Sequence, residues 1–393
     1  MYDLDEREVE AVRQVFARRK LFRYQAGGAG ECDLFEAEFS KILGVTHSLL
    51  LTSGTNALVA ALGACEIGPG DEVIIPAYTF VATAMAVVQV GAIPVIANID
   101  ETLGISPSEV EALVTDRTRA IIPVHMDGLA ADIGAIVEIA KRRKLRVIED
   151  VAQALGASFR GRRLGSWGDF GCFSLNENKH LSAGEGGIAV TSQESLYERA
   201  FCIHDGSAQF NPNKKDSFRQ ISPFLGGSMR VSEITGAIMR IQLQRLEGIL
   251  SSLRQRKNIL LAKLAHQTLA RLPVGACPNG DSGSSLHLFL PDPATALKVS
   301  RALWEIGIAF APVISRPAHV CWKWASFLGD RSSWNPRNNA YRLTDRVYTY
   351  PTSKYLSSVA ILTCMLRLEI DPNLSLDETE RLSDRILSVL TRI

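Results

Sequence analysis

One lysine stands where the surrounding sequence could hold it over a bound cofactor. The segment Asp169–Lys179 runs from a short apolar strand into a polar turn, and the glycine-rich turn Gly184–Gly187 follows. A lysine held between two strands in this way could form a Schiff base with a carbonyl group. A lysine in a polar turn is more often a solvated surface residue, so the choice depends on the neighbouring motifs.

Two carboxylates, Glu149 and Asp150, end the apolar run Val147-Ile148. Ligands of a parallel sheet bind beyond the carboxyl ends of its strands, so we expect Asp150 at that edge. An anionic aspartate keeps a pyridine nitrogen protonated, which lets the ring withdraw electrons from a carbanion, and pyridoxal phosphate requires such a partner. An aspartate after a strand can also cap a helix, and the residues alone leave both roles open.

A turn of small residues, Ser53-Gly54-Thr55, joins an apolar strand to a helix start. Unpaired backbone N–H groups and the positive end of a helix favour phosphate at such a turn. Turns of this composition are common, and most of them bind nothing. The turn therefore indicates a phosphate site only in combination with Lys179 and Asp150.

Alternating strand and helix patterns from about residue 48 to residue 192 must position these groups. They predict an α/β fold with a mostly parallel sheet and helices on both faces. The sequence Ser106-Pro107-Ser108-Glu109 supplies a helix cap, a first-turn proline and a glutamate at the third helical position. The expected strands are 48–52, 72–76, 93–99, 120–124 and 146–149, and the expected helices are 55–65, 83–90, 107–114 and 133–143.

The last third of the chain differs in composition. Apolar residues recur at helical spacing from Ser232 to about Leu264, which predicts a long helix or a helix pair. A strand candidate at 286–290, a helix at 294–306 and a C-terminal helix from near Leu376 then predict a smaller α+β domain. We expect residues 1–245 to form an N-terminal segment and the large domain, and residues 246–393 to form the smaller domain.

Charge and composition exclude several classes of function. The net charge is +1, without a long Lys/Arg run, so neither nucleic acid nor an anionic membrane is an expected partner. The acidic start Met1–Glu6 does not resemble a signal peptide, and no apolar run has the length of a membrane span, which favours a soluble cytoplasmic protein. The seven cysteines are scattered without a C-x-x-C pair, which argues against a disulfide framework and a metal site.

Four short motifs contain the residues discussed so far or lie between them: Thr52–Thr55, Pro76–Phe80, Glu149–Gln153 and Asn178–Gly187. In order and spacing they resemble the DegT/StrS family of pyridoxal-phosphate-dependent sugar aminotransferases, in the aspartate aminotransferase superfamily of fold type I. The similarity runs from about Phe22 to the C-terminus. It implies a PLP-dependent transferase fold and a homodimer with active sites at the subunit interface.

The resemblance also implies a role for each matching residue. Lys179 would form the Schiff base and carry the proton between the substrate's α-carbon and C4′ of the cofactor. Asp150 would pair with the pyridine nitrogen. The other implied cofactor contacts are Gln153 beside the 3-hydroxyl group, Phe80 on the ring face, and Gly54, Thr55 and Ser174 around the phosphate.

Other positions leave the choice of role open. Many relatives have asparagine in place of Ser228, and that asparagine reaches the phosphate of the neighbouring subunit, whereas a serine hydroxyl is a shorter donor. Phe22-Arg23-Tyr24 is similar to a subgroup that acts on keto or aldehyde sugars, so Arg23 could bind a substrate carboxylate or form a structural salt bridge. Tyr24 and His180 are further substrate candidates. Four residues could line the pocket, but ordinary packing is the expected role of each: His125, His180, Trp322 and Trp324.

The implied reaction is a ping-pong transamination. Glutamate or glutamine would leave its amino group on the cofactor as pyridoxamine phosphate, and a keto or aldehyde sugar or a cyclitol would then accept it. Two alternatives are a pyridoxamine-phosphate-dependent sugar dehydratase and a non-catalytic DegT-like regulator. In the dehydratase a histidine replaces the Schiff-base lysine, so the presence of Lys179 disfavours it. The regulator would be expected to have lost Lys179 or Asp150, and both are present.

Overall fold

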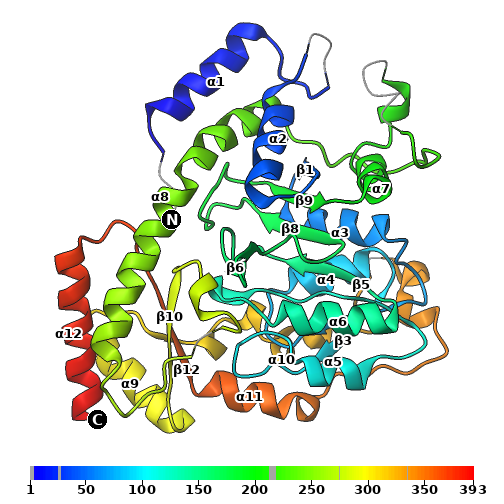
Figure 1. The fold of residues 1–393 in the computed structure, drawn as a ribbon. Coiled ribbons are helices and arrows are strands. Elements are labelled where there is room, and N and C mark those ends of the chain that lie inside the picture. Colours follow the sequence, from blue (N-terminus) through cyan, green and yellow to red (C-terminus); the bar gives the residue numbers. More distant parts are fainter. Residues whose placement is uncertain (1–3, 25–27, 212–217, 274, 334) are drawn as a thin grey trace.

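A seven-stranded sheet forms the centre of the computed structural model, which describes residues 4–24, 28–211, 218–273, 275–333 and 335–393 (Figure 1). Its strands are β1 (His47–Leu51), β2 (Glu72–Pro76), β3 (Ile93–Ala97), β4 (Thr118–Ile121), β5 (Arg146–Asp150), β8 (Phe170–Ser174) and β9 (Gly187–Thr191). The order is β1-β9-β8-β5-β4-β2-β3. β9 is antiparallel to both neighbours and the other pairs are parallel, which confirms the predicted mostly parallel sheet.

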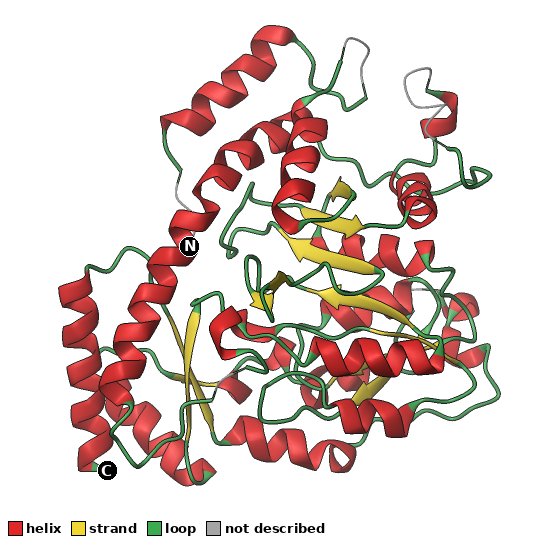
Figure 2. Ribbon diagram, viewed as in Figure 1, coloured by secondary structure: helices red, strands yellow, loops and turns green. Residues whose placement is uncertain are grey.

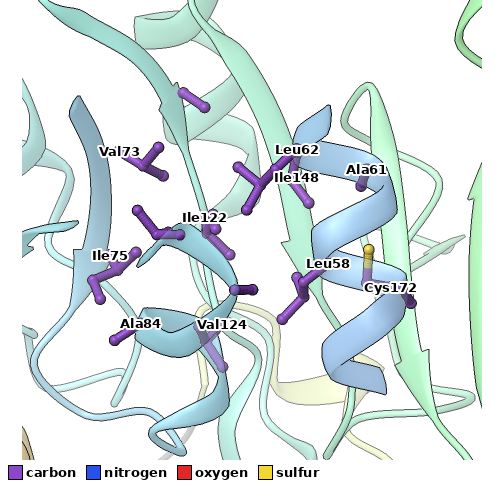
Figure 3. Close-up of a cluster of buried hydrophobic side chains, with 14 of the residues drawn as sticks. Leu58, Ala61, Leu62, Val73, Ile75, Ala84, Ile122, Val124, Ile148 and Cys172 are labelled. Carbon is purple, nitrogen blue, oxygen red and sulfur yellow. The ribbon is translucent and has the colours of Figure 1, made fainter. Parts of the chain in front are cut away.

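Helices cover both faces of this sheet (Figure 2). One face carries α3 (Gly54–Ala64), α4 (Ala82–Gln89) and α7 (Glu194–His204), and the other carries α2 (Glu31–Leu43), α5 (Pro107–Leu113), α6 (Ile133–Arg143) and the start of α8 (Glu233–Leu264). In Figure 3, Leu58 and Leu62 of α3 lie against the side chains of the sheet, among them Ile148. Each fully buried side chain of this kind contributes roughly 1.5–3 kcal/mol, so the sheet is a rigid platform for residues at its edge.

The helix boundaries follow from local capping chemistry. Ser106 caps α5 by accepting a hydrogen bond from the Glu109 N–H at 3.4 Å, and Pro107 occupies the first helical position, as predicted. Ser53 caps α3 in the same way, accepting from the Asn56 N–H at 3.1 Å. Because both caps follow strands, they place the first helical turns beyond the carboxyl ends of β3 and β1.

A second sheet forms the core of the smaller domain. It consists of β10 (Ser285–Phe289), β12 (Met365–Glu369) and β11 (Ala311–Pro312), in the order β10-β12-β11, with antiparallel pairing. Side chains of α9 (Pro293–Glu305), α12 (Leu376–Arg392) and the second half of α8 pack together with this sheet. The remaining α-helices and strands of the described residues are α1 (Glu6–Arg18), the hairpin strands β6 (Ser158–Phe159) and β7 (Arg162–Arg163), α10 (Cys321–Trp324) and α11 (Leu356–Thr363).

The division into domains differs from the predicted one in two respects. The predicted boundary at 245/246 falls inside α8, which is one continuous helix rather than a pair. Leu246 and Leu250 belong to the core of the large domain and Leu253 to that of the small domain, so the helix passes between the cores near residue 251. The second difference is that part of the C-terminal third returns to the core of the large domain: Val313, Val320, Cys321, Trp324, Ala325, Tyr355 and Leu362.

None of the helices in the described parts of the chain combines the length and the apolar character that crossing a membrane requires. The longest of them, α8, carries charged side chains along its whole length, and its apolar residues contact the two domain cores.

Candidate active site

A cavity of about 520 Å³ lies beyond the carboxyl end of β5 and is lined by residues of both domains. The structure brings most of the predicted site residues to this one cavity. Two of them, Lys179 and Asp150, are the residues that the sequence singles out for chemistry. The other predicted residues in its lining are Gly54, Thr55, Phe80, Gln153, Ser174 and His180.

The start of α3 forms one end of the cavity and has the features of a phosphate site. Gly54 and Thr55 lie in the first helical turn, where backbone N–H groups have no acceptor within the helix. A Cβ atom added at Gly54 would lie 2.9 Å from Cβ of Ser174, so the close contact between the turn and β8 requires glycine at this position. The backbone therefore presents its N–H groups next to a serine hydroxyl.

Asp150 is the last residue of β5, and its buried carboxylate is held at both oxygens. The Thr83 hydroxyl donates to Oδ2 at 2.8 Å, and the Ala152 N–H donates to Oδ1 at 3.1 Å. Burial raises the pKa of Asp150, and these hydrogen bonds and the charge of Lys179 oppose the rise. A buried carboxylate of this kind favours a cationic partner in the cavity, because such a partner would stabilise its charged form.

Lys179 lies in the turn after β8, where its backbone N–H donates to the Asn176 carbonyl at 3.0 Å. Limited solvation lowers the pKa of the Lys179 amine, and the negative charge of Asp150 opposes this effect. The neutral amine, which is the nucleophilic form, is therefore more accessible near neutral pH than in an ordinary lysine. The site thus combines an amine of lowered pKa, a buried carboxylate and a helix start with backbone N–H groups that have no acceptor within the helix.

Comparison with known proteins finds a family that matches the sequence. The sequence profile described as the DegT/DnrJ/EryC1/StrS aminotransferase family matches residues 2–384. The chain belongs to this family.

Two relatives of this DegT/DnrJ/EryC1/StrS family member are named as aminotransferases. UDP-N-acetyl-3-dehydro-alpha-D-glucosamine 3-aminotransferase of Acidithiobacillus ferrooxidans is 44% identical over 54% of this chain and 56% of its own length. L-glutamine:2-deoxy-scyllo-inosose aminotransferase of Streptomyces kanamyceticus is 36% identical over 72% of this chain and 68% of its own length. The match to the first of these relatives thus spans little more than half of that protein.

A solved structure of 3-amino-5-hydroxybenzoic acid synthase shares the fold over the whole chain. It superposes with a TM-score of 0.82 at 26% identity, covering 100% of this chain and 98% of that chain. The superposition confirms the predicted fold class. The central sheet, the long α8 and the smaller C-terminal sheet therefore form an aminotransferase fold.

Three further predicted residues of this family member lie at the cavity wall. The Gln153 side-chain oxygen accepts a hydrogen bond from the Asp127 N–H at 3.3 Å, which fixes its orientation. The Phe80 ring lies 5.2 Å from the His319 ring, centroid to centroid, and is partly exposed to the cavity. Burial lowers the pKa of His180 to about 4, so this side chain is neutral at neutral pH.

Arg23 and Tyr24, predicted as substrate residues, do not line the cavity. The Arg23 guanidinium is buried in an ion pair with Glu36, and its Nη1 donates to the Leu50 carbonyl at 2.9 Å. The Tyr24 hydroxyl is hydrogen-bonded to His204 Nε2 at 2.9 Å. Of the two roles considered for Arg23, the structural salt bridge is therefore the one that the structure supports, because a guanidinium enclosed in the core cannot reach a substrate.

This assignment predicts a loss of stability when the pair is broken. Changing Arg23 to methionine is expected to lower the free energy of unfolding by about 3–5 kcal/mol, because it leaves the Glu36 carboxylate buried without its partner. Urea denaturation measures the effect, and the double variant Arg23→Met/Glu36→Gln should recover part of the loss. A stable Arg23→Met variant with a raised KM for the acceptor would contradict the structural role.

Ser228 lies outside the cavity lining as well. It is exposed and forms an isolated antiparallel bridge with Asp205. Its role toward the phosphate of a neighbouring subunit stays a prediction.

Three of the residues expected to pack are found in packed positions. His125 is fully buried, and its Nε2 lies 3.2 Å from Oε2 of Glu149. Trp324 and Trp322 contact the core of the large domain.

Sequence reasoning missed a polar cluster that lines the cavity and contains residues of both domains. Asp127, Arg316, His319, Arg367 and Glu369 all line the cavity. Asp127 had a usable signal, since it comes shortly after the expected apolar strand 120–124. The two arginines had none, because no local pattern indicates that residues so distant in the sequence meet at this wall.

Proposed function

We propose that this chain is a pyridoxal-phosphate-dependent aminotransferase that moves an amino group from glutamate or glutamine to a keto or aldehyde sugar or a cyclitol. The observation that carries the proposal is the presence of Lys179, Asp150 and the phosphate-binding turn at Gly54 in one cavity. The named relatives support the reaction class, since their names describe amino transfer to a sugar nucleotide and to a cyclitol.

The residues of the cavity fit pyridoxal phosphate. The N–H groups of Gly54 and Thr55, with the Ser174 hydroxyl, would bind its phosphate. Asp150 would hold a proton on the pyridine nitrogen, and this salt bridge would supply the cationic partner that the buried carboxylate favours. Gln153 and Phe80 would contact the 3-hydroxyl group and the ring face.

Once bound, the cofactor supplies an electron sink for the bond that breaks at the substrate's α-carbon. The Nζ amine of Lys179 would take the proton from that carbon and would carry it to C4′ of the cofactor. The lowered pKa of its amine suits this work, because a general base is most effective when its pKa lies near the working pH. Asp150 would keep the ring nitrogen protonated throughout and would not exchange a proton with the substrate.

The pKa of Lys179 leads to a prediction about cofactor capture. In the cofactor-free protein, the rate at which Lys179 reacts with pyridoxal phosphate should rise with pH, with a midpoint below that of a free lysine amine. The lowered pKa makes the neutral, nucleophilic amine available at lower pH. Stopped-flow absorbance across a pH series measures the rate, with N-acetyl-lysine methyl ester as the reference. Identical midpoints for protein and reference would contradict the prediction.

Assembly and location belong to the same proposal. A homodimer with active sites at the subunit interface would place the exposed Ser228 within reach of the other subunit. The chain would act on small-molecule substrates in the cytoplasm. The presence of Lys179 at the cavity disfavours the dehydratase, and the presence of both Lys179 and Asp150 disfavours the regulator.

Transfer of labelled nitrogen tests the function. The holoenzyme is supplied with glutamate or glutamine labelled with ¹⁵N at the α-amino group and with a panel of keto sugars and keto cyclitols. We expect ¹⁵N in an amine product and an equal amount of 2-oxo acid by mass spectrometry. Loss of water from a sugar without transfer of nitrogen would favour the dehydratase, and donor that stays unconsumed would favour the regulator.

A further inference from the structure

Two buried threonine hydroxyl groups form a hydrogen-bond chain that ends on the carboxylate of Asp150. Thr83 is the second residue of α4, Thr79 precedes that helix, and neither residue is exposed. The Thr83 hydroxyl donates to Asp150 Oδ2 at 2.8 Å, and Thr79 Oγ1 lies 2.6 Å from Thr83 Oγ1. We call Thr79 and Thr83 the threonine pair. The carboxylate that lines the cavity is thus bound on its protein side by this pair.

The supply of protons fixes the direction of this hydrogen-bond chain. A threonine hydroxyl has one proton to donate, and Thr83 gives it to Asp150, so Thr79 must donate to Thr83 while Asp150 is ionised. If Asp150 takes up a proton, both hydroxyl groups can turn, because Thr79 Oγ1 also lies 3.2 Å from the Phe80 carbonyl. A hydrogen bond to a charged carboxylate is stronger than one between neutral groups, so the threonine pair favours ionised Asp150.

The fold holds Thr83 in place but keeps it out of the cavity. The Thr83 N–H donates to the Phe80 carbonyl at 3.1 Å, and Ala84, the next residue of α4, lies among the buried side chains of the large core (Figure 3). Thr83 also belongs to the first turn of α4, and the positive end of a helix stabilises a nearby anion. Asp150 lines the cavity and Thr83 does not. Thr83 can therefore affect a bound ligand only through Asp150.

The other groups around Asp150 leave Thr83 a large part in its ionisation. Burial raises the pKa of Asp150, and the strongest opposing effects are the hydrogen bonds from the Ala152 N–H and the Thr83 hydroxyl, followed by Lys179 and His125. Cys172 is the partner of Asp150 on β8, and burial raises the pKa of its thiol well above the usual value, so the thiol is neutral. Among the side chains, Thr83 therefore opposes the effect of burial most.

A buried carboxylate beside a pyridine nitrogen can share a proton in two ways. The proton lies on the nitrogen, which gives an ion pair, or on the carboxylate, which gives a neutral pair. Burial favours the neutral pair, because an ion pair loses more hydration free energy when it leaves water. Hydrogen bonds donated to the carboxylate favour the ion pair, because they stabilise the charged carboxylate most. The donors to Asp150 therefore decide where such a proton lies.

We propose that Thr83, with Thr79 as its donor, is a positioning residue that keeps the shared proton on the ring nitrogen of the cofactor rather than on Asp150. The inference rests on the proposed function and deepens it, since the ring withdraws electrons most effectively when its nitrogen is protonated. No proton passes through the threonine pair during the reaction. The pair acts by stabilising the negative charge of Asp150.

The ¹⁵N chemical shift of the ring nitrogen tests the proposal. The holoenzyme is loaded with pyridoxamine phosphate labelled with ¹⁵N in the ring and is measured by solid-state NMR at neutral pH. We expect the shift of a protonated pyridine nitrogen in the wild type and a displacement toward that of neutral pyridine in Thr83→Val. Thr83→Ser keeps the hydroxyl and should retain the wild-type shift. Thr79→Val should give a smaller displacement in the same direction.

The matched control is Thr115→Val, which removes a hydroxyl that donates to Glu72 Oε2 at 2.6 Å, outside the cavity lining. This variant should keep the wild-type ¹⁵N shift. A wild-type shift in Thr83→Val would overturn the proposal. Circular dichroism shows whether each variant is folded. If Thr83→Val does not fold, Thr79→Val decides the question, and a wild-type shift in that variant would overturn the proposal in the same way.

Infrared titration of the cofactor-free protein separates this inference from the proposed function. The carboxyl band of Asp150 is identified by its loss in Asp150→Asn. We expect Thr83→Val to move the titration midpoint of Asp150 to higher pH by about one pH unit or more, because the charged form loses a donor. An unchanged midpoint would contradict the role of Thr83. A neutral ring nitrogen in the wild-type holoenzyme would instead contradict the role proposed for Asp150, and the infrared titration would still decide the effect of Thr83.

Discussion

Changing Lys179 to alanine is expected to abolish transamination, lowering kcat by at least about a thousandfold, because the variant loses the group that moves the proton. The chain should still fold and bind pyridoxamine phosphate. The phosphate turn at Gly54 and Thr55 and the Asp150 carboxylate do not depend on the lysine side chain. Steady-state kinetics and equilibrium titration with pyridoxamine phosphate measure the two effects separately.

The control for this variant is Lys141→Ala, which removes an exposed lysine in the last turn of α6, away from the cavity. Its kcat should equal that of the wild type. Unchanged turnover in Lys179→Ala would falsify the proposed mechanism. Loss of pyridoxamine phosphate binding together with loss of turnover would show instead that the lysine is needed to build the site.

The second large effect is expected at Asp150. Asp150→Asn keeps the size of the side chain and removes the charge that holds the pyridine nitrogen protonated. We expect kcat to fall by about a hundredfold or more, and the affinity for pyridoxamine phosphate to fall much less, because the phosphate contacts remain. The amide could still accept from the Thr83 hydroxyl, which donates to Asp150 Oδ2 at 2.8 Å, so the local fold should persist.

Asp132→Asn serves as the comparison, since Asp132 caps α6 outside the cavity lining and asparagine is an equally good cap. This variant should keep wild-type kcat. Wild-type activity in Asp150→Asn would mean that the aspartate only stabilises the end of β5. A fall in cofactor affinity as large as the fall in kcat would also argue against the assigned role.

The parts of the site that the sequence predicted are those that local patterns determine. The bounds of α6 follow from apolar periodicity between two charged ends, and the end of β5 at Asp150 follows from the change from apolar to charged residues. The turn at Ser53 could be predicted because a cap, a glycine and a helix start are adjacent in the chain. Short-range chemistry of this kind does not depend on the rest of the fold.

The parts that were missed depend on tertiary contacts. Arg316 and Arg367 contact Asp127, although they lie 189 and 240 residues further along the chain (316 − 127 and 367 − 127). Sequence periodicity does not indicate contacts between residues so far apart. The sequence left the role of Arg23 open for the same reason. Its partner Glu36 lies on α2, and the ion pair becomes buried only when the chain folds.

The predicted domain boundary at 245/246 differs from the observed one because α8 is continuous. Its sequence shows no break at the point where its contacts change from one core to the other. The apolar residues of α8 keep their spacing while the partner changes from the large core at Leu250 to the small core at Leu253. Sequence periodicity predicts the helix but does not indicate which core each part of the helix contacts. The return of the segment around Trp324 to the large domain is a further tertiary effect of this kind.

Chemical trapping of the cofactor at its attachment point tests the central claim most directly. The purified holoenzyme is reduced with borohydride, digested and examined by mass spectrometry, with a parallel sample treated first with glutamate or glutamine. We predict a pyridoxyl adduct on Lys179 in the untreated sample and its loss after donor treatment, as the amino group passes to the cofactor. An adduct on another lysine, or bound cofactor without any adduct, would contradict the account.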